Sequence, residues 1–144
     1  HYKRVVPLTT LRRECGVSRD GSKASNIVRA ARRYGMEAKG FTKSVKKLYD
    51  IKPPFIVFWN FNHFVTFEGF GKGCVYLNDP AVGHRTVTLK EFQRSFTGVV
   101  LVMEPGPDFV PGGRLPSVVG SIRSRLVGSW KAMGFCFLAG LLLV

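Results

Sequence analysis

Residues 63–79 read His-Phe-Val-Thr-Phe-Glu-Gly-Phe, then Gly-Lys-Gly, then Cys-Val-Tyr-Leu-Asn-Asp. Two apolar-rich runs on either side of a short glycine-containing turn are typical of an antiparallel β-hairpin. Residues 54–59 and 98–103 are continuous apolar runs of strand length, which predict two further buried strands. Residues 88–96 begin with Thr-Leu-Lys-Glu, the pattern of a capping box, and predict a short helix. The middle of the chain therefore predicts an antiparallel sheet.

The sequence before this sheet predicts helices. Residues 8–14 have a helical pattern that ends at Gly16. Ser22 has the position of an N-cap for a second helix, which ends at Gly35. The apolar residues of that helix recur at helical spacing and are Ile27, Ala30, Ala31 and Tyr34. Residues 44–50 predict a third short helix, and helices followed by an antiparallel sheet define an α+β domain.

The composition fits a single globular domain with an uneven charge. The chain has 144 residues, of which 45% are hydrophobic and 22% are charged, and these values exclude a disordered or fibrous protein. The net charge is +13, and residues 1–50 hold 13 of the 22 lysines and arginines but only 4 acidic residues. Such a charge suggests nucleic acid as a partner. No recognition motif is present, however, and the aromatic residues fall mainly in the neutral middle, so we expect no nucleic-acid partner.

The glycines and cysteines predict no cofactor or metal site. Residues 35–42 have the glycine spacing of a phosphate-binding loop, but Phe41 stands where that loop needs a lysine. The cysteines Cys15, Cys74 and Cys136 lie far apart, which excludes a disulfide framework and zinc-type spacing. A reducing, cytosolic setting fits this use of cysteine best.

The C-terminal segment differs from the rest. Residues 111–127 contain several prolines and glycines and then apolar residues with two arginines, which predicts a linker and an interfacial helix. Residues 128–144 include 13 uncharged, mainly apolar residues after Lys131. A transmembrane helix needs about 20 such residues, so this segment is either a buried core helix or the start of a span that the chain end cuts off. The basic flank favours the span. The predicted division is 1–110, 111–127 and 128–144.

His63 and Asp79 carry the strongest chemical signal. If Phe70 pairs with Cys74 across the turn, Val65 lies opposite Asp79, and His63 is its diagonal neighbour on the same face. Such neighbours are roughly 7–8 Å apart, so their side chains can meet. A carboxylate in this place orients an imidazole and stabilises its cation. A histidine beside an aspartate also occurs in structural roles, so the pattern permits a catalytic pair without requiring one.

A catalytic base of this kind needs a nucleophile, and no cysteine is well placed for it. Cys15 follows a helix, where the helix dipole disfavours a thiolate. Cys74 begins a strand, and Cys136 lies in the apolar tail. Ser18 and Ser22 are better explained as turn and cap residues.

Four segments, taken together, are similar to one known family. They are Glu-Cys-Gly-Val-Ser-Arg-Asp-Gly-Ser-Lys-Ala-Ser-Asn-Ile (14–27), Trp-Asn-Phe-Asn-His-Phe-Val (59–65), Tyr-Leu-Asn-Asp-Pro-Ala (76–81), and Glu-Phe through Glu-Pro-Gly-Pro-Asp-Phe (91–109). In this order they resemble the peptidase domain of bacteriocin-exporting ABC transporters, the double-glycine leader peptidases. The resemblance covers about residues 2–113. It implies a papain-like cysteine peptidase fold and cleavage after a Gly-Gly or Gly-Ala pair in a leader peptide.

The resemblance also implies roles for particular residues. In the family a cysteine nucleophile heads the first helix, a preceding glutamine helps to form the oxyanion hole, and a histidine and an aspartate complete the site. His63 and Asp79 fall on these last two positions and are the expected catalytic residues. The nucleophile helix and its glutamine are expected immediately before Tyr2 and are absent. Cys15 matches a later, non-catalytic segment, so the chain alone is expected to be inactive.

The wider expectations come from the same resemblance. The family's exporters lie in the bacterial inner membrane, with the peptidase domain on the cytosolic side. The expected partners are the leader peptide of a bacteriocin-like precursor, the membrane through the C-terminal segment, and a second full-length transporter in a homodimer. ATP and magnesium are expected only in the ATPase domain of the full-length transporter. Two alternatives are a degenerate domain that binds leaders without cleaving them, which the retained His63 and Asp79 disfavour, and a basic membrane-surface module.

Overall fold

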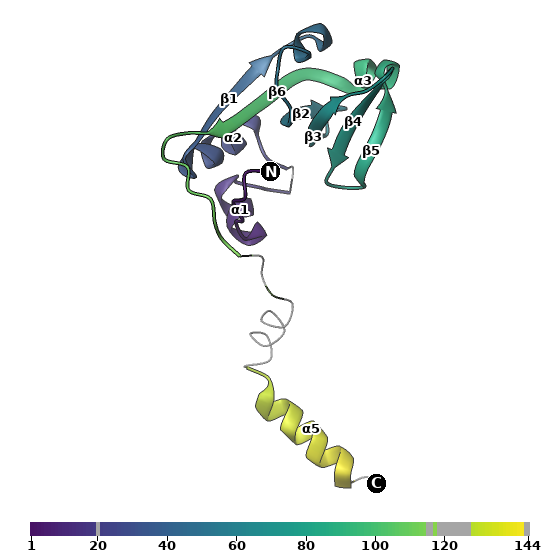
Figure 1. Cartoon of the computed structure of the whole chain (residues 1–144). Helices are drawn as coiled ribbons and strands as arrows, with labels where there is room; N and C mark the ends of the chain where they lie inside the picture. Colours follow the sequence, from purple (N-terminus) through teal and green to yellow (C-terminus); the bar gives the residue numbers. More distant parts are fainter. Residues whose placement is uncertain (20, 115–116, 118–127, 143–144) are drawn as a thin grey trace.

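The computed structural model describes residues 1–19, 21–114, 117 and 128–142 (Figure 1). Its centre is a six-stranded antiparallel sheet. The strands are β1 (Met36–Thr42), β2 (Phe55–Trp59), β3 (His63–Phe70), β4 (Cys74–Asp79), β5 (Gly83–Thr88) and β6 (Phe96–Pro105). The helices around it are α1 (Leu8–Glu14), α2 (Ala24–Arg33), the 3₁₀ helix η1 (Val45–Leu48) and α3 (Leu89–Ser95). The predicted α+β class is confirmed.

The strand order in the sheet is β1-β6-β2-β3-β4-β5. Strands β2 to β5 follow one another both in sequence and in space, whereas β6 inserts between β1 and β2. In the β1–β6 pair, Met36 lies opposite Pro105 and Thr42 lies opposite Val99. In the view of Figure 1, α2 lies beneath β1 and β6, while α3 lies beside β4 and β5.

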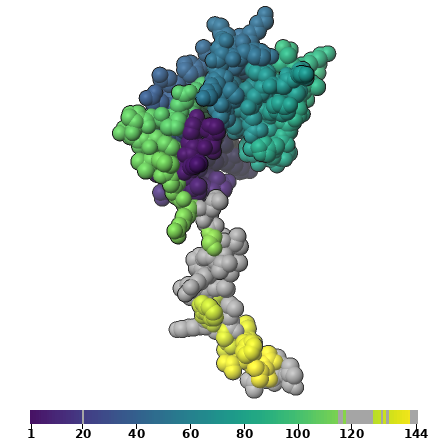
Figure 2. Space-filling view, viewed as in Figure 1, coloured from purple at the N-terminus to yellow at the C-terminus, as the bar shows by residue number. Residues whose placement is uncertain are grey.

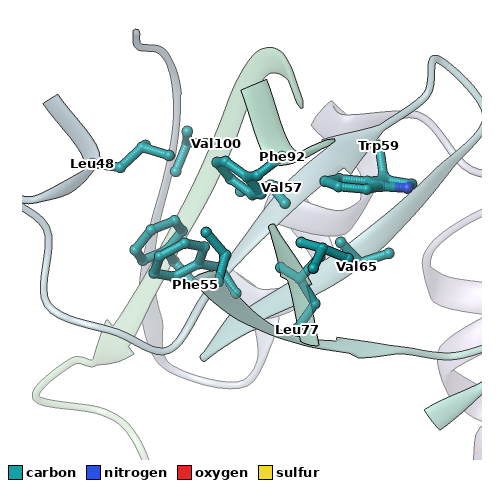
Figure 3. Close-up of a cluster of buried hydrophobic side chains, with 11 residues drawn as sticks. Leu48, Phe55, Val57, Trp59, Val65, Leu77, Phe92 and Val100 are labelled. Carbon is teal, nitrogen blue, oxygen red and sulfur yellow. The ribbon is translucent and has the colours of Figure 1, made fainter. Parts of the chain in front are cut away.

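The larger hydrophobic core lies on the face of the sheet that α3 and η1 cover (Figure 3). Alternate residues of a strand point to opposite faces, so Phe55, Val57 and Trp59 of β2 all point into this core. Phe92 of α3 is fully buried at its centre. The other buried members are Leu48, Val65, Phe67, Val75, Leu77, Val87 and Val100. This core holds together the end of the sheet where His63 lies.

A smaller core joins α2 to the opposite face of the sheet. Its buried members are Val28 of α2, Ala38 of β1 and Leu101 of β6. Arg29 and Arg33 are exposed on the outer side of α2. The helix is therefore amphipathic, with basic residues on the side that meets solvent.

The helices form where the sequence predicts them, with one correction at an N-terminus. Lys23, not Ser22, is the N-cap residue of α2, and no side chain caps that helix. The Ser22 hydroxyl instead donates a hydrogen bond of 2.6 Å to the carbonyl oxygen of Cys15. In α3 the predicted cap is confirmed, because Thr88 Oγ1 accepts a hydrogen bond from the Glu91 amide.

The hairpin of β3 and β4 has the predicted register at one end and a shifted register at the other. Away from the turn, Thr66 lies opposite Asn78, as predicted. Near the turn, Phe70 lies opposite Val75, so the predicted pairing with Cys74 is wrong. A β-bulge in the middle of the pair shifts the register by one residue. The bulge leaves the end that carries Asp79 in the predicted alignment.

Strand β5 has no counterpart in the sequence prediction. It pairs with β4 along its whole length, from Cys74 opposite Thr88 to Asp79 opposite Gly83. Val87 is its buried residue. Because β5 adds an edge strand beside β4, it places new side chains next to Asp79.

The first residues of the chain lie against the segment that follows β6 (Figure 2). The Val5 amide donates a hydrogen bond of 2.7 Å to the Gly112 carbonyl, and the Gly112 amide donates one of 2.9 Å to the Lys3 carbonyl. The Tyr2 hydroxyl donates a hydrogen bond of 3.1 Å to the Met103 carbonyl. These contacts close the domain by joining its two ends.

The helix α5 (Trp130–Leu142) lies in the predicted C-terminal segment. No helix in the described part of the chain is long and apolar enough to span a membrane. The predicted start of a transmembrane helix at 128–144 and the predicted boundaries at 110 and 127 therefore stay predictions. The predicted interfacial helix at 118–127 lies outside the described residues.

Candidate active site

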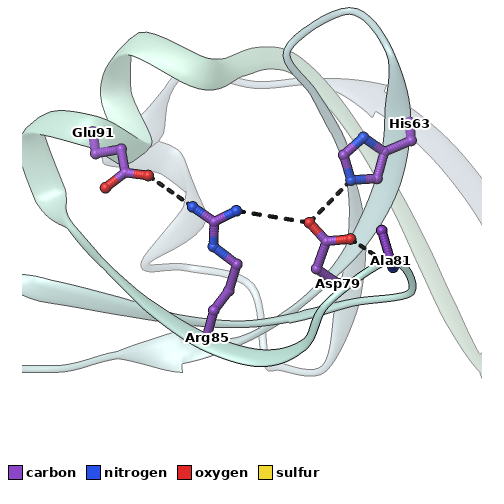
Figure 4. A network of polar contacts seen from close by, with 5 residues as sticks. All are labelled: His63, Asp79, Ala81, Arg85 and Glu91. Carbon is purple, nitrogen blue, oxygen red and sulfur yellow. Dashed lines mark hydrogen bonds and ion pairs between the residues drawn. The ribbon is translucent and has the colours of Figure 1, made fainter.

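His63 and Asp79 lie at the same end of the sheet, where β3 begins and β4 ends (Figure 4). Trp59, the last residue of β2, lies opposite His63 in the sheet. His63 has the same strand parity as the core residue Val65, and Asp79 has that of Leu77, so both point to the face of the larger core. The pair therefore lies at the edge of the larger hydrophobic core, on the same face of the sheet.

The two side chains make the contact that the predicted register allows. His63 Nε2 lies 3.0 Å from Asp79 Oδ2. The Ala81 amide donates a hydrogen bond of 2.9 Å to Asp79 Oδ1, so both carboxylate oxygens have partners. Asp79 is only 3% exposed, whereas the His63 side chain is 33% exposed. The buried Asp79 carboxylate therefore holds one edge of the His63 ring, while part of that ring stays exposed to solvent.

The surroundings of Asp79 keep it ionised. Burial on its own raises the pKa of this carboxyl. The hydrogen bonds from the Ala81 amide and from His63, together with the charges of His63 and Arg85, outweigh burial and hold the pKa below its ordinary value. An ionised Asp79 accepts hydrogen bonds only, so the neutral His63 ring carries its proton on Nε2.

This geometry leaves His63 Nδ1 as the nitrogen that can take a proton. Within the described part of the chain, Nδ1 makes no hydrogen bond to another residue. A carboxylate that fixes one ring nitrogen while the other faces outward is the arrangement of a general base with its orienting acid. The pair is chemically suited to deprotonate a nucleophile.

The three cysteines of the chain lie away from this pair. Cys74 is at the opposite end of β4 from Asp79, a separation of roughly 17 Å along an extended strand. Cys15 is the C-cap residue of α1, and burial followed by the charge of Glu14 raises the pKa of its thiol. Cys136 lies in α5. None of them is placed or activated as the partner of His63.

Cys15 instead lines an apolar groove of about 390 Å³. The groove is bordered by α1, α2 and the two ends of the domain, and its residues include Tyr2, Ile27, Tyr34 and Phe109. Neither His63 nor Asp79 belongs to it. The groove and the histidine pair are therefore separate features of the domain.

Two further charged residues continue the polar end of the core. Arg85 of β5 has one guanidinium nitrogen, Nη1, 3.8 Å from Asp79 Oδ2. Its other terminal nitrogen, Nη2, donates a hydrogen bond of 2.8 Å to Glu91 Oε1 of α3. The sequence pattern assigns no strand to the region of β5, so Arg85 is not among the predicted site residues. Glu91 is predicted only as part of the capping pattern of α3. The alternation of Thr86, Val87 and Thr88 is the signal that indicates this strand.

A six-stranded antiparallel sheet flanked by helices, with a His–Asp pair at one end, agrees with the papain-like cysteine peptidase class that the sequence predicts. The family model of the Peptidase C39 family matches residues 1–108, so the chain belongs to this family. It is 33% identical over 109 residues to the "Colicin V secretion/processing ATP-binding protein CvaB" of Escherichia coli, covering 76% of this chain. The match spans only 16% of that relative's length.

The solved structures agree with this assignment. The crystal structure of a double glycine motif protease from an AMS/PCAT transporter, in complex with the leader peptide, is 50% identical to this chain with a TM-score of 0.70. The match covers 72% of this chain and 75% of that one. The peptidase domain of Streptococcus ComA, described as a bifunctional ABC transporter, shares the fold with a TM-score of 0.67 at 24% identity. It covers 73% of this chain and 82% of the other. The expected relationship to double-glycine peptidases is confirmed.

The lowered pKa of Asp79 predicts an acid-sensitive fold. The folded-state pKa lies below the unfolded value of about 3.9, so this carboxylate stabilises the fold above about pH 4. That stability is lost as the pH falls through the folded-state pKa. We expect Asp79→Asn to lower the free energy of unfolding at neutral pH and to weaken its dependence on pH in the acid range.

Urea unfolding at a series of pH values, followed by circular dichroism, measures this effect. Asp50→Asn is the matched control, because Asp50 is an exposed aspartate that makes no ion pair within the described residues. This control should unfold with the pH dependence of the unsubstituted chain. If Asp79→Asn also keeps that dependence, Asp79 is not held ionised by its neighbours.

Proposed function

We propose that this chain is the peptidase domain of a peptide-exporting ABC transporter and serves to remove the double-glycine leader of the exported peptide. The contact of 3.0 Å between His63 Nε2 and Asp79 Oδ2 carries the proposal, because it supplies a base and its orienting acid. Membership of the Peptidase C39 family and 50% identity to a leader-bound double glycine motif protease support it.

His63 and Asp79 have separate roles in the proposed reaction. His63 Nδ1 takes the proton of a cysteine thiol, and the thiolate attacks the carbonyl carbon of the second residue of the leader's glycine pair. The peptide C–N bond then breaks, and His63 returns the proton to the departing amine. Water hydrolyses the thioester that remains, with His63 again acting as the base. Asp79 keeps the ring oriented and stabilises its charged form throughout.

The thiol of this reaction is not one of the three described cysteines. Cys74 lies at the opposite end of β4 from Asp79, and Cys136 lies in α5. Cys15 lines a groove that does not include His63, and its raised pKa works against a thiolate. We propose that a part of the exporter outside these 144 residues contributes the nucleophile. Residues 1–144 then provide the base, its orienting acid and the fold that holds them.

The proposed setting follows from the exporter as a whole. The domain works on the cytosolic side of the bacterial inner membrane, where the precursor is made. ATP and magnesium bind in the ATPase domain of the complete transporter, which acts as a homodimer, and the C-terminal segment connects the peptidase domain to the membrane part. Each of these statements rests on the family relationship, since the matches span only 16% of the length of the CvaB and MchF relatives.

A second candidate is a domain that binds leaders without cleaving them. It is favoured by the positions of Cys74, at the opposite end of β4 from Asp79, and of Cys15, in a groove that His63 does not line. The buried, ionised Asp79 on His63 disfavours it, because leader binding alone has no need of a buried charge, which is costly to maintain. Cleavage in the complete exporter separates the two candidates.

A binding and cleavage assay tests the proposal on this chain. The probe is the leader peptide seen with the 50% identical relative, labelled with a fluorophore and extended beyond its glycine pair. We expect the purified chain to bind the probe more tightly than a scrambled peptide of the same composition, measured by fluorescence anisotropy. We expect no thiol-dependent cleavage, and Cys15→Ala should change neither result.

Two outcomes contradict parts of the proposal. Equal binding of the probe and the scrambled peptide contradicts leader recognition by this domain. Cleavage that disappears in Cys15→Ala overturns the assignment of the nucleophile, because it makes Cys15 the attacking thiol. Cys74→Ala is the matched control, since Cys74 is also partly buried and lies far from Asp79.

A further inference from the structure

Arg85 links the candidate catalytic pair to the helix α3 (Figure 4). Its Nη1 lies 3.8 Å from Asp79 Oδ2, which also contacts His63. Its Nη2 donates a hydrogen bond of 2.8 Å to Glu91 Oε1. The guanidinium also lies 5.9 Å from the centre of the Trp59 ring. Arg85 thus contacts three of the groups that border the site.

We propose that Arg85 is a positioning residue for the peptidase reaction, which fixes the Asp79 carboxylate so that Asp79 in turn holds His63. The inference rests on the proposed function, because positioning has a purpose only if His63 acts as a base. Arg85 touches neither substrate nor thiol in this role and works through Asp79 alone.

The strand pairing explains why Arg85 reaches Asp79. In the β4–β5 ladder Asp79 lies opposite Gly83, and Leu77 lies opposite Arg85. Arg85 is therefore the diagonal neighbour of Asp79, on the face that also carries His63. Its position on the strand directs the guanidinium toward Asp79 Oδ2, the oxygen that also accepts the hydrogen bond from His63.

The arginine is itself held in place from two sides. Glu91 lies in the first turn of α3, where its amide bonds to Thr88 Oγ1. Its carboxylate binds one end of the planar guanidinium, and the Trp59 ring lies near the guanidinium. A guanidinium restrained in this way can fix the carboxylate that it faces.

The other interpretation is that Arg85 and Glu91 form an ordinary surface ion pair. The Arg85 side chain is 35% exposed and that of Glu91 is 46% exposed, and such pairs contribute little to stability. A stability measurement alone cannot separate the two interpretations. The state of the hydrogen bond between His63 and Asp79 can, because a surface pair has no effect on it.

Nuclear magnetic resonance of the full chain in mild detergent tests the proposal. Two signals are followed, namely the Nε2–H proton of His63 and the carboxyl carbon of Asp79. In the unsubstituted chain we expect a downfield, slowly exchanging Nε2–H proton, because it is shared with a buried carboxylate. In Arg85→Met we expect this proton to exchange at least about tenfold faster, and the Asp79 titration to move to higher pH.

Two more variants separate charge from position. Arg85→Lys keeps a positive charge but loses the planar, two-ended contact. It should restore the Asp79 titration without restoring slow exchange of the His63 proton. Glu91→Gln keeps Arg85 but removes its carboxylate anchor, and it should speed the exchange by less than Arg85→Met does. Both variants are milder, so they keep the test decisive if Arg85→Met does not fold.

The controls lie in the same domain. Arg94→Met removes an exposed arginine of α3 that makes no ion pair within the described residues, and it should leave both signals unchanged. His84, which contacts Glu68 at 3.0 Å, reports on the fold in every variant. Unchanged His63 and Asp79 signals in Arg85→Met overturn the role of Arg85. Absence of the slow proton in the unsubstituted chain instead contradicts the His63–Asp79 contact, and with it the proposed function.

Discussion

Leader cleavage by the exporter that carries this domain should fall by about 10⁴-fold or more when His63 is replaced by alanine. His63 supplies the nitrogen that takes the thiol proton. Among the described residues, no other histidine contacts a buried carboxylate. Asp79→Asn should cause a loss of similar size, because an amide no longer fixes which ring nitrogen carries the proton. The measurement is the ratio of cleaved to intact precursor in cells, read by mass spectrometry.

Two matched control variants test whether the loss of cleavage is specific to His63 and Asp79. His84→Ala removes a histidine that pairs with Glu68 at the surface, and such exposed pairs contribute little to stability. Asp50→Asn removes an exposed aspartate. Both should cleave at the rate of the unsubstituted exporter. Normal cleavage by His63→Ala, with the protein present at its usual level, rules out His63 as the base.

Phe92→Ala should destabilise the domain by about 3–5 kcal/mol. Phe92 is fully buried, and its ring centre lies 5.7 Å from that of Trp59 and 5.4 Å from that of Phe96. Removing the ring leaves a cavity between α3 and the sheet that the strands cannot close. A loss of this size is a large part of the total stability of a domain, which is about 5–15 kcal/mol.

Urea unfolding followed by circular dichroism measures the loss. Phe61→Ala is the control, because Phe61 is 80% exposed and its removal should change stability by less than about 0.5 kcal/mol. Equal stability of Phe92→Ala and the unsubstituted chain contradicts the packing of α3 onto the sheet. Because only the folded domain holds His63 on Asp79, leader processing should fall with the folded fraction.

The sequence predicts those parts of the fold in which the signal is local. The capping pattern at Thr88 predicts α3, and the apolar run at 54–59 predicts β2. Ser22 shows the limit of local reasoning, because its hydroxyl finds a partner in the Cys15 carbonyl, across a loop that the sequence does not define. The β-bulge in the β3–β4 pair is another such case, since it depends on how the strands twist around the core.

The candidate site divides in the same way. The contact between His63 and Asp79 follows from the register of one hairpin, so the sequence predicts it. Arg85 and Glu91 belong to the next strand and the next helix, and the short polar strand β5 has too few apolar residues to be recognised with ease. Their positions become visible only when the strand pairing is known.

The insertion of β6 between β1 and β2 has a consequence for folding during synthesis. As the ribosome releases the chain, the strands from β2 to β5 can pair with their neighbours at once, but β1 has to wait for residues 99–105. Until then, both β1 and β2 present unpaired backbone edges, which are open to association with other chains. During this stage the hairpin of His63 and Asp79 can already pair, because β3 and β4 precede β6 in the chain. Once β6 is made, it pairs with β1 on one side and with β2 on the other, so both exposed edges are covered by the same strand.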